Sequence, residues 1–264
     1  MTEFLQKYLL PLIHPMERPD AWGAFHSLFF FIGIPSAILV AFFLRGISKK
    51  SEKILFFTIG TLLALSEIFK GLAFTAIEGA YRFDLIPFQL CSIPMYLCIL
   101  MPMLPEGKLS GAMRTFIGTF GLMGGVASYI APGTMCRDWF ELTLHSFIWH
   151  LILIFLGFYV FFSHNTKIQK YDFLRAEILY LSLCTIAFVI NLLCFNTPGT
   201  PVNMFYIGPK PSILPICREI TAQFGVAVNS VIYILALSTC AFLMYFFEKL
   251  LKYIFKRIDN TRWL

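Results

Sequence analysis

Long apolar runs recur along the whole chain, and they restrict its fold more than any other feature. A helix rises about 1.5 Å per residue, so about 20 mostly apolar residues cross a bilayer core of roughly 30 Å. The sequence predicts an all-α fold: a polytopic membrane protein with a bundle of seven transmembrane helices over residues 22–247. The runs lie at about residues 22–44, 54–77, 87–104, 110–130, 143–162, 178–194 and 224–247.

The charge content agrees with a membrane setting. Charged residues make up 14% of the chain, whereas a soluble domain carries roughly 25%. Because so few charges cannot cover a water-facing surface, we expect lipid to be the main solvent. The net charge of +6 is spread over the loops, where it orients a membrane protein and does not indicate nucleic-acid binding. The expected partners are membrane lipids and a small-molecule or lipid substrate.

The distribution of Lys and Arg predicts an orientation. Positive charge favours the cytoplasmic side of a membrane, which places the N-terminus outside and the C-terminus inside a cell membrane. Residues 1–21 are expected to form an interfacial segment, and residues 248–264 a basic cytoplasmic tail. The more basic side carries Arg45, Lys49, Lys50, Lys53, Lys108, Lys167, Lys170, Arg175, Lys249, Lys252, Lys256, Arg257 and Arg262.

Polar side chains interrupt three of the predicted spans at a similar depth. In this orientation all of them fall in the outer layer of the bundle. Charged groups inside a membrane usually face the bundle interior and mark functional sites, so the convergence predicts an outward-facing polar cavity. The residues concerned are Glu67 and Lys70 in the second span, Gln89, Cys91 and Ser92 at the start of the third, and His145 and His150 in the fifth.

Cys91 is the candidate nucleophile of this layer. It lies where the third span begins, and a helix N-terminus favours the thiolate form of a cysteine. A nearby histidine would then act as its base, and His150 is the candidate because it lies deeper in an apolar run. His145 and His150 are about 140° apart on a helix, and the sequence leaves open which of them faces the site. The alternative for Cys91 is a small packing residue.

The remaining polar residues are candidates for substrate binding. Glu67 and Lys70 are three residues apart and can pair on one helix face, holding a lipid headgroup or forming a purely structural pair. Gln89, Ser92, His145, Asn191 and Asn203 complete this candidate set. No metal-binding spacing is present, and no cofactor is expected.

Further expectations concern packing and loops. The glycines of the fourth span, Gly121, Gly124 and Gly125, should let it approach a neighbouring helix closely. Arg114 should extend its charge to the membrane surface. The long segment 195–223 is a lid or an interfacial loop. Whether the outer-loop residues Cys136 and Cys217 form a disulfide stays open.

Four short motifs together resemble those of the YwaF-like family of bacterial integral membrane proteins. The similarity covers residues 22–247, and distant animal relatives of that family are reported as phospholipid acyltransferases that use a membrane Cys and a His. The resemblance implies that Cys91 accepts the acyl group and that His150 is its base. The chain departs from the usual family form at Gln89, where His is expected. The motifs are Ser66–Lys70, Leu85–Ser92, His145–His150 and Asn203–Phe205.

Two functions are compatible with these residues. One is a Cys/His lipid acyltransferase or acyl hydrolase that acts on phospholipid. The other is a transporter or binding protein for a small solute or lipid, based on Glu67 and Lys70. A retinal-type receptor is disfavoured, because the seventh span contains no Lys before Lys249.

Overall fold

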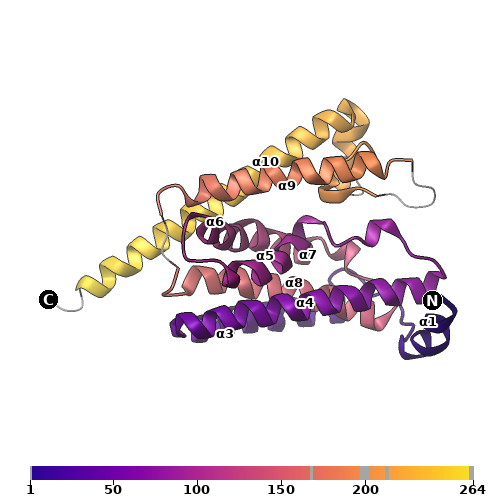
Figure 1. Ribbon diagram of the computed structural model, residues 1–264, viewed down its shortest axis with the longest axis horizontal. Helices are drawn as coiled ribbons and strands as arrows, with labels where there is room; N and C mark the ends of the chain where they lie inside the picture. The colour runs from indigo at the N-terminus through magenta and orange to yellow at the C-terminus, as the bar shows by residue number, and fades with distance from the viewer. Residues whose placement is uncertain (1, 167–168, 197–201, 212–213, 262–264) are drawn as a thin grey trace.

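The computed structural model of the chain describes residues 2–166, 169–196, 202–211 and 214–261. Helices make up nearly all regular structure in this part of the chain, beside one isolated bridge between Pro15 and Trp139. The long helices lie roughly parallel, with α9 and α10 in a layer over the others (Figure 1). The α-helices are α1 Thr2–Tyr8, α2 Ala24–Leu28, α3 Ile34–Phe43, α4 Lys49–Glu78, α5 Ile93–Leu100, α6 Lys108–Phe116, α7 Leu122–Ile130, α8 Phe140–Phe162, α9 Asp172–Leu193 and α10 Pro215–Thr261. Shorter helical turns are η1 Leu10–Leu12, η2 Phe29–Gly33, η3 Leu44–Gly46, η4 Phe83–Leu85, η5 Leu90–Ser92, η6 Met101–Met103, η7 Ile117–Gly121, η8 Pro132–Thr134 and η9 Met204–Tyr206.

Five of the helical stretches are long and apolar enough to cross a membrane. They confirm a multi-pass, all-helical membrane protein. A sixth stretch, Leu90–Met103, is apolar but shorter, and the α6–η7–α7 stretch is the remaining one of the seven that the sequence suggested, so the count of seven spans stays a prediction. The five candidate spans are Ala24–Gly46, Lys49–Glu78, Phe140–Phe162, Asp172–Leu193 and Ile216–Leu250.

The α6–η7–α7 stretch is central to the bundle. All five residues of η7 are buried, and glycines allow its neighbours to approach. A Cβ atom on Gly121 would lie 3.1 Å from Pro94, and one on Gly125 would lie 2.9 Å from Ile154. Both distances are shorter than ordinary side-chain contacts, so these positions need glycine. The expected close approach of this helix is therefore confirmed.

Several helix ends differ from the sequence-based bounds because local hydrogen bonds of polar side chains stabilise earlier starts. The Ser48 side chain accepts a hydrogen bond from the Ser51 amide, so α4 begins at Lys49 and not near residue 54. The side chain of Asp172 accepts a hydrogen bond from the Gln169 amide at 2.7 Å, and α9 begins at Asp172 and not near residue 178. The structureless segment expected at 195–223 is also interrupted, by η9 and by the start of α10.

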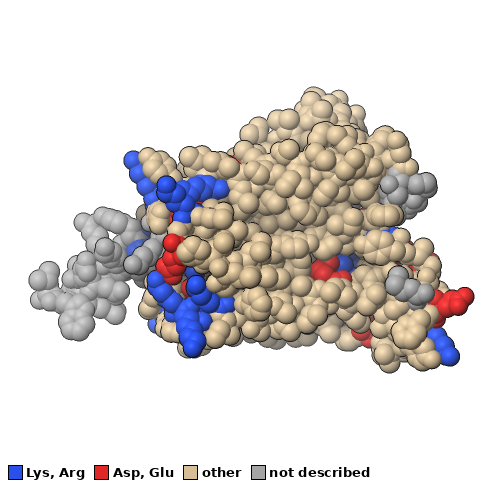
Figure 2. All heavy atoms as spheres, in the orientation of Figure 1, with Lys and Arg blue, Asp and Glu red and all other residues tan. Residues whose placement is uncertain are grey.

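The two ends of the bundle differ in charge. Figure 2 shows Lys and Arg gathered at the end from which α10 extends, while the flank between the ends is mostly uncharged. Helix α1 lies at the opposite end (Figure 1), where the N-terminal segment is attached to α8 by an ion pair of 2.6 Å between His14 and Glu141. The termini are thus at opposite ends, and the assignment of either end to the cytoplasm stays a prediction.

Candidate functional site

Glu67, Lys70 and His145 form a polar group between α4 and α8. The Lys70 ammonium donates a hydrogen bond of 2.7 Å to Glu67 Oε1, which lies 3.9 Å from His145 Nε2. The side chains of Glu67 and His145 are 6% and 9% exposed, and that of Lys70 is 23% exposed. The α4 spacing of three residues creates the ion pair, as expected, and α8 adds the histidine.

This group is under-satisfied. Neither ring nitrogen of His145 has a hydrogen-bond partner among the described residues. Glu67 Oε2 makes no hydrogen bond there either, but it lies 2.5 Å from the Lys70 ammonium and is paired with its charge. A buried polar atom without a partner costs roughly 1–3 kcal/mol. Such atoms need an explanation, and a ligand that supplies the missing bonds is one.

Cys91 lies beside this group, at the turn η5 that leads into α5. Its thiol is within electrostatic range of Lys70 and Glu67. The Trp149 indole donates a hydrogen bond of 3.1 Å to the Cys91 carbonyl, which fixes the backbone of the turn against α8. Ser92 follows as a buried residue. The turn forms here because Pro94 suits the first turn of α5 and cannot extend a helix backwards.

His150 has a defined ring orientation. Its Nδ1 atom lies 2.7 Å from the Ser146 carbonyl oxygen. A carbonyl oxygen only accepts, so Nδ1 carries the proton and, in the neutral ring, Nε2 is left with a lone pair. His150 and His145 both lie within electrostatic range of Lys70, although the helix separates their directions.

The central helix packs against both η5 and α8. A Cβ atom on Gly124 would be 3.9 Å from Cys91 Cβ, an ordinary contact, and one on the next residue, Gly125, would be 3.0 Å from the His150 carbonyl oxygen. Gly125 therefore lets α7 approach the α8 backbone closely. That the His150 ring reaches the Cys91 thiol stays a prediction.

The three amide residues of the predicted set lie in a different arrangement. Gln89 donates to the Asn203 carbonyl at 3.1 Å and accepts from the Phe205 amide at 2.9 Å. Asn191 holds both backbone groups of Met204, at 2.9 and 2.6 Å.

Asn203 folds the same segment through bonds with Gly208 and Lys210. All three amides thus use their side chains on the backbone of the η9 region. The prediction that they bind substrate stays untested.

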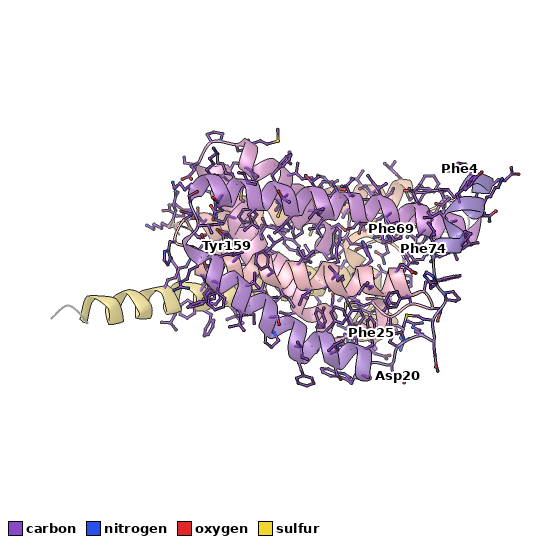
Figure 3. All side chains as sticks on the ribbon, turned by 90° about the horizontal axis from the view of Figure 1, so that it is seen from below. Phe4, Asp20, Phe25, Phe69, Phe74 and Tyr159 are labelled. Carbon is purple, nitrogen blue, oxygen red and sulfur yellow. The ribbon has the colours of Figure 1, made fainter. Side chains whose placement is uncertain are left out.

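A second buried polar group lies at the other end of the bundle. Arg114 binds both carboxylate oxygens of Glu52, at 2.8 and 3.0 Å, and so does not extend to the membrane surface as expected. The hydroxyls of Tyr159 and Ser163 donate to Glu52 Oε1 at 3.1 and 3.0 Å. Figure 3 labels Tyr159 near one end and Phe74, on the α4 face that carries Glu67, near the other.

Access to the two groups differs. A cavity of about 300 Å³ lies near Arg114, lined by residues including Gly111, Asp172 and Glu248. The Glu67–Lys70 pair lies away from the ends of α4, and the Lys70 side chain is 23% exposed while that of Glu67 is 6% exposed. That the site opens to the outside stays a prediction.

Some features of the site were not found from the sequence. Trp149, which holds the Cys91 carbonyl and stacks at 5.5 Å on His145, was read only as part of an apolar run. Its position four residues after His145 was the available signal. No disulfide joins Cys136 to Cys217, the pairing that was left open.

Comparison with known proteins identifies the family. The model of the TMEM164 family matches residues 21–249, and the chain belongs to this family of membrane proteins. No curated protein and no solved structure matches the chain. The relationship to YwaF-like proteins and to acyltransferases stays a prediction.

Proposed function

We propose that this member of the TMEM164 family transfers acyl groups of membrane lipids, with Cys91 as the nucleophile and His150 as its base. The observation that supports the proposal is that Cys91, His145 and His150, from η5 and α8, all lie within electrostatic range of Lys70 in the α4 ion pair, inside an apolar bundle. Buried ionisable groups are costly in a membrane and are rare without a function.

The ring of His150 is suited to the role of base. The bond from Nδ1 to the Ser146 carbonyl leaves Nε2 free to accept a proton. The triad of hydrolytic enzymes uses the same principle, in which a second group orients the imidazole. In His145 both nitrogens are free and the Glu67 carboxylate is close, so we assign His145 to substrate binding.

The proposed reaction has two steps. His150 takes the Cys91 proton, the thiolate attacks the ester carbonyl of a phospholipid, a C–S bond forms and the C–O bond breaks. The proton passes to the leaving lysolipid oxygen. In the second step an alcohol gives its proton to His150 and its oxygen attacks the thioester carbonyl. A C–O bond forms, the C–S bond breaks, and His150 returns the proton to the Cys91 thiolate. Water in place of the alcohol would make the protein an acyl hydrolase.

The surroundings assign roles to the other residues. The amides that directly follow Cys91 are not available to an oxyanion, because those of Ser92 and Ile93 donate to the Gln89 and Leu90 carbonyls and Pro94 has no N–H. Glu67, Lys70 and His145 would bind the headgroup, and Ser92 lies next to the nucleophile. The partial exposure of Lys70, at 23%, on a helix that is long and apolar enough to cross a membrane favours a lipid that enters from the bilayer over a solute that enters from water.

The test is a thioester trap with a matched control. Protein in liposomes that contain phospholipid with a labelled acyl chain should acquire label that hydroxylamine releases. Cys91→Ala should lose it, whereas Cys98→Ala, which alters a fully buried thiol further along the same helix, should keep it. His150→Ala should slow labelling by about 10²–10⁴-fold.

Two results would contradict the proposal. One is full lipid turnover by Cys91→Ala. The other is thermal stabilisation by a soluble solute that survives Cys91→Ser and is lost in Glu67→Gln, which would support transport or solute binding in its place.

A further inference from the structure

Three arginines gather at the end of the bundle nearest the Glu67 group, and two of them have polar partners. Arg82 donates to Asp84 at 2.9 Å and to Glu78 at 2.7 Å. Arg18 donates to the Gly133 carbonyl at 2.7 Å. The third, Arg137, has neither a hydrogen bond nor an ion pair from its guanidinium to any described residue.

The backbone of Arg137 is fixed although its charge is unpaired. The Thr143 hydroxyl accepts from the Arg137 amide at 2.9 Å and donates to its carbonyl at 3.0 Å. The guanidinium then lies over the ring of Phe74, 5.7 Å from its centre. Arg82 approaches the same ring at 5.9 Å, so two cations share one aromatic side chain.

The setting of Arg137 disfavours its charge. Partial burial lowers the pKa of this guanidinium and the positive charges of Arg18 and Arg82 lower it further, whereas the nearby Asp84 carboxylate raises it. An arginine nevertheless stays charged in a protein, and Arg137 as a whole is an exposed residue that a ligand can reach. A cation among other cations, with no ion pair to a described carboxylate, would gain from a bound anion.

Helix geometry places this cation next to the proposed site. Phe74 follows Lys70 by four residues on α4, which is about 6 Å along the same helix face. Arg137 also lies within electrostatic range of His145. Along α4, the Glu67–Lys70 ion pair is therefore followed by Phe74, and the guanidinium of Arg137, from the segment before α8, lies over that ring. The group of Glu67, Lys70 and Arg137 carries one net positive charge.

We infer that Arg137 and Lys70 together bind a phosphate group at the mouth of the Glu67 site. The planar guanidinium can donate two parallel hydrogen bonds to phosphate oxygens, and Lys70 adds a point charge. The free ring of His145 offers a further donor. The location rests on the proposed function, whereas the phosphate chemistry does not depend on Cys91. The source of the phosphate is a lipid headgroup or a free phosphate.

Binding measurements on the purified full chain in detergent test this inference. The probes are dihexanoyl-phosphatidylglycerol, dihexanoylglycerol, which lacks the phosphate, and inorganic phosphate. The phosphate-bearing lipid should bind about 10- to 100-fold more tightly than dihexanoylglycerol, as expected for charge-assisted hydrogen bonds. Arg137→Gln should abolish this preference, and Arg137→Lys should keep part of it.

Controls separate the inference from the proposed reaction and from misfolding. Arg218→Gln alters an arginine whose side chain is 69% exposed and should keep the preference, with thermal unfolding checked for every variant. Cys91→Ala should also keep it, even if acyl transfer is never detected. Binding of inorganic phosphate that depends on Arg137 and matches the lipid would support the site and assign a soluble source. A preference that persists in folded Arg137→Gln would overturn the inference.

Discussion

Two buried polar groups, one around Glu52 and one around Glu67, each pair a glutamate with a basic residue, but they differ in how many of their polar atoms have hydrogen-bond partners. At one end Glu52 receives two hydrogen bonds from Arg114 and one from each of two hydroxyls. Nearer the opposite end, Glu67 is paired with Lys70, and neither ring nitrogen of His145 has a partner among the described residues. A fully satisfied network stabilises a fold, whereas a partly satisfied one in the same medium indicates a place for a ligand.

This difference in hydrogen bonding suggests that the Glu52 group stabilises the fold and that the Glu67 group serves the activity. The Glu52 group joins α4, α6 and α8 at the basic end, and every atom of its carboxylate has a partner. The Glu67 group adds little to such a connection because its pair lies within one helix. We therefore expect mutations in the first group to lower stability, and mutations in the second to lower activity while stability changes little.

The largest expected effect is the loss of one partner in the satisfied group. Arg114→Met leaves the 3%-exposed Glu52 carboxylate without its cation, which should cost about 3–5 kcal/mol of unfolding free energy. The double variant Glu52→Leu/Arg114→Met should recover most of this loss. Unfolding in mixed micelles measures both. A single variant that costs less than about 1 kcal/mol would remove the contrast between the groups.

A smaller effect of opposite sign is expected at His145. Phe in its place keeps the ring contact with Trp149 and removes two unpartnered nitrogens, so the unfolding free energy should stay constant or rise by about 1 kcal/mol. Lipid turnover should fall. His26→Phe is the matched control: its ring is buried and bonded at 3.0 Å to both Trp22 and Tyr129.

The control should cost about 1–3 kcal/mol, because it strands the Trp22 amide and the Tyr129 carbonyl. Equal losses in both histidine variants would mean that His145 is as structural as His26. If His145→Phe has the same unfolding free energy and the same lipid turnover as the unmodified protein, this residue is not part of the proposed site.

The smallest effect is expected at a surface pair that serves as a reference. Lys49 donates to Glu106 at 2.8 Å, with both side chains more than half exposed, so Lys49→Ala should cost less than about 1 kcal/mol. The bond from Lys49 lowers the pKa of Glu106 below its ordinary value of 4.5. The contribution of this ion pair to stability is therefore present at neutral pH and is lost as the pH falls through the lowered pKa of Glu106. Salt should weaken it, and a larger, salt-independent loss would contradict this interpretation.

Much of the membrane fold could be predicted, and helix ends less so. Long apolar runs correspond to five candidate spans because the bilayer demands length and apolarity directly. The starts of α4 and α9 were missed, since Ser48 and Asp172 hold them through side-chain hydrogen bonds, in turns that are too polar for a hydropathy argument. Arg114 was misread because its partner Glu52 is 62 residues away.

The candidate site was predicted in part for a similar reason. Glu67 and Lys70 are local neighbours, so their pairing follows from helix spacing. That His145 approaches Glu67, and that Trp149 holds the Cys91 carbonyl, depends on the rotation of α8 against α4 and η5. Periodicity along one helix carries no information on such rotation. Arg137 likewise becomes distinctive only when the partners of Arg18 and Arg82 are known.

The sequence by itself determined the medium and the local pairs: spacing and hydropathy act along one chain segment, and they decide that helices form, that lipid surrounds them, and that Lys70 neutralises Glu67. Tertiary structure alone decided which polar atoms are satisfied. The Glu52 carboxylate accepts four hydrogen bonds and the His145 ring makes none with any residue that the structure describes, because hydrogen bonds between helices depend on how the helices are packed and rotated.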